Sequence, residues 1–222
     1  MVQRSTFLVL GATGKTGTHF VAKALEDGHT VRALVRTPAK LEGRPATLDV
    51  RQGSITDDLD MDALVDGCDY VVSMLGDRNL QQTVMINTAF VKKLVPSMRR
   101  KGVKRFLCQA GGLSTPYGGR LSPLLWTIRH TLARSFLGQH RDNEAVMAYF
   151  ATEANDIEWI VHRAGIGSDG PSKGVLQRST SRPSVATHRD CATYNYHTVT
   201  DASAVRTADF SRYVSAGRTA TG

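Results

Sequence analysis

The stretch that decides the fold lies near the start of the chain: Thr6-Phe7-Leu8-Val9-Leu10, followed by Gly11-Ala12-Thr13-Gly14-Lys15-Thr16-Gly17. A short apolar run of this kind is typical of a buried parallel strand. It leads into a glycine-rich turn, after which Phe20, Val21 and Leu25 can form one apolar face of a helix. The stretch therefore predicts a strand, a glycine turn and a helix.

A glycine turn between a strand and a helix is suited to a pyrophosphate. Gly11 allows the tight turn, Gly14 lets the backbone approach the phosphates, and Gly17 permits close packing of the helix on the sheet. The helix N-terminus presents unpaired N–H groups and a partial positive charge to the anion. A P-loop is excluded, because Gly11 and Gly14 are not separated by the four residues that a P-loop requires.

The end of the second expected strand, 30–35, indicates which dinucleotide is bound. About twenty residues after the glycine turn, an NAD site places Asp or Glu, which binds the ribose 2′-hydroxyl. This chain has Arg36 there. Arginine can pair bidentately with a 2′-phosphate and stack on adenine. We therefore expect NADP(H) as the cofactor.

Strand and helix patterns alternate along the rest of the chain, which implies a parallel sheet with right-handed crossovers. No internal repeat or interdomain linker is visible. We expect an α/β fold: a single Rossmann-type doubly wound parallel sheet with helices on both faces, over residues 1–214, and a flexible tail at 215–222. Further strands are expected at 47–52, 69–75, 104–109 and 157–162, and helices at 61–65, 81–100 (kinked or shortened by Pro96) and 121–150 (two segments meeting near Gly138).

The stretch 170–200 is rich in Ser, Thr and Arg and shows little periodicity. We expect it to hold one or two late strands and a loop on the substrate side. A final short helix is predicted over 207–214.

Composition narrows the class of protein. The 222 residues suffice for one α/β domain, and 41% hydrophobic with 22% charged residues is ordinary for a globular chain. No apolar run reaches the roughly eighteen residues of a membrane span, and the N-terminus offers no secretory apolar region. We therefore expect a cytoplasmic protein without a membrane partner. Cys68, Cys108 and Cys191 are odd in number and widely spaced, which argues against disulfides and against a metal site.

The net charge of +8 raises the question of nucleic-acid binding. The densest basic cluster, at 92–105, lies at the end of an expected helix, where the helix dipole favours cations, and no aromatic residues are interleaved with it. We expect a small-molecule substrate rather than a nucleic acid, and a monomer or weak homodimer.

The motifs together resemble the atypical short-chain dehydrogenases of the NmrA-like NAD(P)-binding group, and within it the biliverdin-IXβ reductase/flavin reductase-like proteins. The resemblance is good to about residue 110. Its motifs are the glycine loop, Leu34-Val35-Arg36, Gly53-Ser54, Leu75-Gly76-Asp77-Arg78-Asn79 and Thr83-Val84-Met85. It implies cofactor contacts from Gly11, Thr13, Gly14, Lys15, Thr16, Gly17, Arg36, Ser54, Ile55, Met74, Leu75, Gly76, Arg78, Cys108, Gln109 and Ala110.

The familiar proton donors of these relatives are missing. The chain contains no Tyr-x-x-x-Lys, and Ala110 and Gly165 stand where flavin-reductase-like relatives carry a serine and a histidine. Ser114 and Tyr117, in a glycine-bounded loop after the fifth strand, are the predicted catalytic residues, because a hydroxyl there could donate a proton to a reduced carbonyl. His140 is a third candidate, although we expect the segment that it heads, 140–144, to cap a helix rather than to act in catalysis.

The sequence therefore predicts an NADPH-dependent oxidoreductase that reduces a planar acceptor, such as a flavin, a quinone or a related conjugated carbonyl, by direct hydride transfer. Reduction of a flavin needs little acid from the protein, because solvent can deliver the proton. Two alternatives stay open: a non-catalytic NADP(H) redox sensor that binds a partner protein, and a biosynthetic reductase or isomerase on the same fold.

Overall fold

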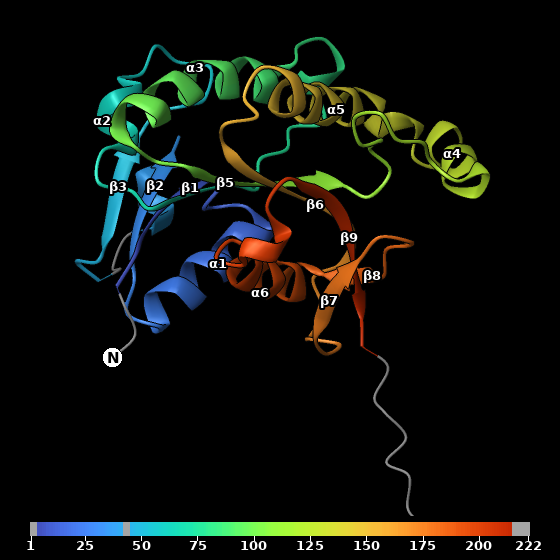
Figure 1. The fold of residues 1–222 in the computed structure, drawn as a ribbon. Helices are drawn as coiled ribbons and strands as arrows, with labels where there is room; N and C mark the ends of the chain where they lie inside the picture. The colour runs from blue at the N-terminus through green and yellow to red at the C-terminus, as the bar shows by residue number, and fades with distance from the viewer. Residues whose placement is uncertain (1–3, 42–44, 215–222) are drawn as a thin grey trace, which may run out of the picture.

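Helices and strands alternate along the chain in the computed structural model, which describes residues 4–41 and 45–214 (Figure 1). The predicted flexible tail, 215–222, lies outside the described residues. The strands are β1 (Thr6–Leu10), β2 (Thr30–Val35), β3 (Leu48–Gln52), β4 (Tyr70–Ser73), β5 (Arg105–Gly111), β6 (Glu158–Ser168), β7 (Leu176–Ser179), β8 (Val185–Thr187) and β9 (Thr207–Tyr213); the helices are α1 (Lys15–Glu26), α2 (Met61–Val65), α3 (Ile86–Lys101), α4 (Pro123–His130), α5 (Leu137–Thr152) and α6 (His188–Thr198).

The strands form one sheet in the order β3-β2-β1-β4-β5-β6-β9-β7, and β8 pairs with β6. All pairs are parallel except β7 with β9. The direction of winding reverses between β1 and β4, because β2 and β3 lie on one side of β1 and the later strands on the other. Ligands of open α/β sheets bind at such a switch point, beyond the carboxyl ends of the strands. The predicted doubly wound fold is confirmed, with an antiparallel strand added at one edge.

Strand β1 is buried on both faces, which explains why its residues are continuously apolar. Leu8 and Leu10 pack with residues of α2, α3 and α5, whereas Phe7 and Val9 pack with residues of α1 and α6. This alternation follows from the two-residue period of a strand. Figure 1 shows the same division, with α2, α3 and α5 over one face of the sheet and α1 and α6 over the other.

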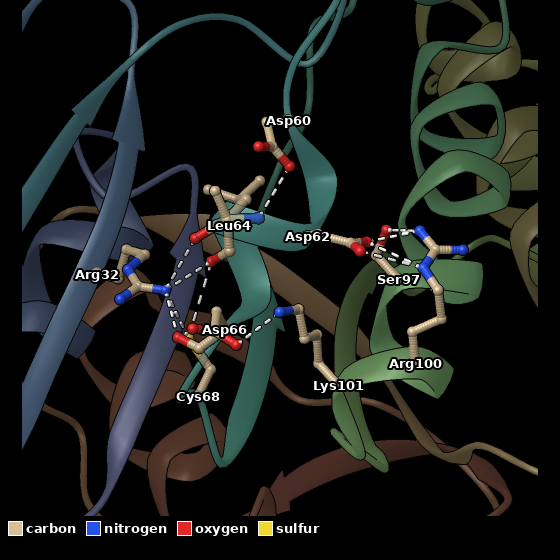
Figure 2. Close-up of polar contacts among 10 residues, drawn as sticks. Arg32, Asp60, Asp62, Leu64, Asp66, Cys68, Ser97, Arg100 and Lys101 are labelled. Carbon is tan, nitrogen blue, oxygen red and sulfur yellow. Dashed lines mark hydrogen bonds and ion pairs between the residues drawn. The ribbon is translucent and has the colours of Figure 1, made fainter.

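Helix α2 has five residues, too few to be stable alone, and side chains at both ends hold it (Figure 2). At its start Asp60 accepts a hydrogen bond from the backbone N–H of Ala63 at 3.0 Å. At its end Arg32 of β2 donates to the carbonyl oxygens of Leu64 and Asp66, at 3.0 and 2.7 Å. Ion pairs attach α2 to α3: Asp62 with Arg100, and Asp66 with Lys101.

Two predictions about the C-terminal part are wrong. The helix expected over 207–214 is strand β9, which pairs with β6 and β7. The stretch 170–200 contains the expected late strands β7 and β8 but also helix α6, which was not expected. The buried face of α6 includes the polar residues Asp190, Asn195 and Thr198, so it carries no hydrophobic period to read.

The other helices depart less from expectation. Helix α3 continues past Pro96 to Lys101, so the proline does not end it. The region 121–150 divides as expected into two helices, the second of which begins at Leu137, next to Gly138. Among the described residues, no helix is both long enough and apolar enough to cross a bilayer.

Candidate cofactor and active site

The turn between β1 and α1 is shaped by its glycines. Gly11 has a φ of +85°, and a Cβ there would lie 2.9 Å from the carbonyl oxygen of Met74. A Cβ at Gly17 would overlap the carbonyl oxygen of Gly11 and lie 2.8 Å from its carbonyl carbon. The first turn of α1 therefore packs directly on the loop.

The N-terminus of α1 is prepared for an anion. Its N-cap is Gly14, so no side chain caps the first N–H groups, and its first turn contains no acidic residue. Uncapped N–H groups and the positive end of the helix dipole favour a bound phosphate. This part of the structure fits a dinucleotide pyrophosphate.

A cleft of about 260 Å³ opens beside this turn, at the switch point of the sheet. It brings together nine of the residues expected to contact the cofactor: Gly11, Thr13, Gly14, Arg36, Ser54, Ile55, Met74, Leu75 and Gly76. Sequence reasoning missed other lining residues: Leu10, Leu34, Val35, Lys40, Gly53, Thr56, Asp77, Leu80 and Ile86.

The cleft has cationic side chains beyond β2. Arg36 follows the strand directly, and Lys40 lies in the 3₁₀ turn Pro38–Leu41; both side chains are exposed and line the cleft. Ser54 also lines the cleft, and it lies in a turn where its N–H donates to Asp57 Oδ2 at 2.7 Å. Two cations at this place suit a 2′-phosphate, and Lys40 could have been noticed as the next basic residue after Arg36.

Two polar side chains of the glycine loop are turned away from the cleft. Lys15 Nζ lies 2.6 Å from Asp169 Oδ2, and Thr16 Oγ1 lies 3.0 Å from His188 Nδ1. His188 Nε2 is also 3.3 Å from Asp169 Oδ1. Neither Lys15 nor Thr16 lines the cleft in this arrangement.

The first turn of α5 packs against Gly76, one of the residues that line the cleft. The amide of Gln139 lies directly over Gly76, leaving no room for a Cβ there, and a Cβ at Gly138 would lie 2.7 Å from Cα of Gln82. The remaining residues expected near the nicotinamide, Arg78, Cys108, Gln109 and Ala110, do not line the cleft. Cys108 and Ala110 are buried in the core, where burial raises the pKa of the Cys108 thiol to about 12, and the side chain of Gln109 accepts from Asn195 at 2.7 Å. Arg78 instead stacks on Phe136.

The structure brings Ser114 together with His140 rather than with Tyr117. Ser114 is fully buried, and its Oγ lies 3.2 Å from His140 Nδ1. Burial, with the nearby charge of Arg129, lowers the pKa of His140 to about 4, so the imidazole is neutral near pH 7. His140 itself lies within α5, and the expected capping is made by Asp142 of the same segment, which accepts hydrogen bonds from the N–H groups of Asn87 and Thr88 at the start of α3. Tyr117 is 61% exposed.

The loop that carries Ser114 is held from three sides. Arg129 donates to the carbonyl of Leu113 and pairs with Glu144, which in turn accepts from the N–H of Thr115 at 2.6 Å. Arg163 of β6 donates to the carbonyl of Ser114 at 2.9 Å. Burial tends to raise the pKa of Glu144, but its bonds to Arg129 and Thr115 hold that pKa below the ordinary value. Ser114 is thus fixed in place.

Comparison with known proteins agrees with this geometry. Residues 11–202 match the model of a family described as NAD(P)H-binding. The chain belongs to this NAD(P)H-binding family. It is 30% identical to the isoflavone reductase homolog IRL of Zea mays over 173 residues, which are 73% of this chain and 49% of the relative. The chain thus spans about half the length of that curated relative.

Other proteins of known structure share the fold of this NAD(P)H-binding chain. The anaerobilin reductase ChuY of Escherichia coli O157:H7 has a TM-score of 0.71 at 15% identity, over 93% of this chain and 96% of that one. A wide-type short-chain dehydrogenase/reductase of Veillonella parvula, solved with NADP, has a TM-score of 0.67 at 14% identity, over 94% of each chain.

The expected NAD(P)-binding family and the expected nicotinamide dinucleotide cofactor are thereby confirmed. The family match also supports the prediction of an NAD(P)H-dependent oxidoreductase. The roles assigned to individual residues stay predictions.

Proposed function

We propose that this chain is an NADPH-dependent reductase of a planar acceptor, such as a flavin, a quinone or a related conjugated carbonyl. The observation that carries the proposal is the pairing, in one cleft, of the uncapped α1 N-terminus with Arg36 and Lys40. Two separate cationic features suit the pyrophosphate and the 2′-phosphate of one NADP(H) molecule. The reductase named among the curated relatives and the neighbour solved with NADP support the proposal.

The chemistry divides between cofactor and protein. Bound NADPH supplies a hydride, which we infer passes directly to the acceptor. The residues of the chain bind and orient: Gly11 and Gly14 admit the phosphates, and Arg36 pairs with the 2′-phosphate. The buried Ser114, hydrogen-bonded to a neutral His140, is too enclosed to act as a strong acid toward the cleft. A planar conjugated acceptor suits this site, because solvent can protonate the reduced product.

The proposal is tested by following NADPH absorbance with FMN, FAD and a small panel of quinones. We expect turnover with at least one of these planar acceptors, alongside saturable binding of NADPH in a fluorescence titration. Tight binding of NADPH without turnover on any of them would contradict the reductase proposal. That result would favour a redox sensor.

Arg36→Ala is expected to weaken NADPH binding by about 10- to 100-fold and to change NADH binding by less than about threefold. Losing one charge-assisted hydrogen bond to a phosphate reduces binding by roughly this factor. NADH binding is little affected, because NADH lacks the 2′-phosphate. The measurement is a fluorescence titration with both nucleotides. Arg51→Ala is the matched control, because Arg51 is an exposed arginine on neighbouring β3 outside the cleft. Equal losses for NADPH and NADH would refute the role of Arg36.

Three further expectations stay predictions: the cytoplasmic location, the monomeric or weakly dimeric state, and the assignment of residues 170–200 to the substrate side.

A further inference from the structure

The glycine loop is fastened to a segment more than 150 residues away in sequence. Lys15 of the loop pairs with Asp169, which directly follows β6, at 2.6 Å. Thr16 bonds His188 at the start of α6, and His188 in turn lies 3.3 Å from Asp169. The four side chains therefore form one cluster that links the proposed pyrophosphate site to the segment after β6.

Lys15 is the basic side chain of the Gly11–Gly17 loop, and it directly follows the N-cap Gly14. A phosphate at the N-terminus of α1 would attract the Lys15 ammonium away from its present partner. Asp169 is able to compete, because its bond to Lys15 keeps the pKa of the carboxyl below the ordinary value and the group charged.

The ion pair between Lys15 and Asp169 is weak, because both side chains are exposed to solvent. The side chains of Lys15 and Asp169 are 69% and 57% exposed, and exposed ion pairs contribute little to stability. An arriving dianionic pyrophosphate can thus displace the carboxylate at small cost, while the carboxylate still lowers the affinity that Lys15 would otherwise give.

We propose that Asp169 lowers the affinity of the chain for its dinucleotide cofactor by competing with the pyrophosphate for Lys15. This inference rests on the proposed function, because it requires NADPH to bind in the cleft. Asp169 is then an affinity-setting residue outside the cleft, and the segment after β6 influences how readily the cofactor leaves.

The test is a double-mutant cycle of Asp169→Asn and Lys15→Gln, read as the Kd of NADPH at low salt. Asp169→Asn is expected to tighten NADPH binding about three- to fivefold, the range of an exposed ion pair. The gain should disappear in the Lys15→Gln background and shrink at 0.5 M salt, where the Debye length is about twofold shorter than at physiological salt. Asp169→Ser repeats the test with a second side chain.

Two controls separate this effect from a general change of charge. Asp156→Asn removes the same charge from an exposed pair with Arg99 at the opposite end of β6, and should leave NADPH binding unchanged. Adenosine 2′-monophosphate, which lacks the pyrophosphate, should bind the wild type and Asp169→Asn equally.

The two proposals fail in different ways. If the wild type does not bind NADPH, the proposed function is wrong and this inference falls with it. If the wild type binds NADPH but Asp169→Asn binds it equally or more weakly, the inference alone is overturned, and the cluster serves only to hold the loop. Tightening that persists without Lys15 would also overturn it.

Discussion

Replacing Asp142 by alanine is expected to lower the free energy of unfolding by about 3–5 kcal/mol, because several buried hydrogen-bond donors lose their acceptor at once. Asp142 lies in α5 and is fully buried. Its carboxylate accepts hydrogen bonds from the N–H groups of Asn87 and Thr88, each at 2.9 Å, from Thr88 Oγ1 at 2.7 Å, and from Gln81 Nε2 at 2.7 Å. It thus caps the N-terminus of α3, where a negative charge is favourable.

The measurement is urea unfolding at neutral pH. Asp142→Asn should lose less than Asp142→Ala, because the amide oxygen still accepts from the start of α3. Arg141→Ala is the matched control: its side chain is exposed on the same helix, so a change within about 0.5 kcal/mol is expected. A loss below about 1 kcal/mol for Asp142→Ala would show that the network contributes little to stability.

Gly17→Ala is expected to weaken NADPH binding by more than about 100-fold. A Cβ at this position would overlap Gly11 and lie 3.0 Å from Cα of Ala12, so both backbone segments must shift. Such a shift moves the N–H groups of the loop away from the phosphates, and losing one or two hydrogen bonds to a charged group, at about 1.5–3 kcal/mol each, gives a loss of this size. The titration with NADPH that tests Arg36 also measures this effect.

Gly170→Ala serves as the comparison for Gly17→Ala. Its backbone φ is not in the left-handed region, and the nearest atom to a Cβ there is 3.7 Å away, an ordinary contact. It should leave both the affinity for NADPH and the unfolding midpoint nearly unchanged. If Gly17→Ala bound NADPH as tightly as Gly170→Ala did, close packing of α1 on the loop would not be needed for binding.

The N-terminal half of the fold could be predicted from the sequence because its signals are local. Strand β2 and helix α2 have the expected bounds, and β1 was read from a continuous apolar run. The C-terminal third could not be predicted in this way. Strand β9 is defined by its pairing with β6, and its own residues, from Thr207 to Tyr213, show no clear alternation of buried and exposed positions.

The candidate site likewise has a part that the sequence predicts and a part that it does not. The spacing between the glycine loop and Arg36 can be read directly from the sequence. The contacts of Gln139 with Gly76 and of Ser114 with His140 depend on where α5 lies against β5, a distance set only by tertiary packing. Tyr117 suits proton donation by its chemistry, yet no local pattern in the sequence indicates that its side chain is exposed while Ser114 is buried.

The first turn of α5 limits how the proposed acceptor can be accommodated. Gly138, Gln139, His140 and Asp142 each fit against a different segment: the turn at Gln81, Gly76, Gly111 and the start of α3. The contacts of Gly138 are with the backbone of Gln81 and Gln82, so the helix itself gives way only by moving as a rigid body, whereas the Gln139 amide is the end of a flexible side chain that can rotate off Gly76. An acceptor that is thin in one dimension needs only that rotation. Bulky, three-dimensional substrates would be excluded by the cost of displacing a whole helix.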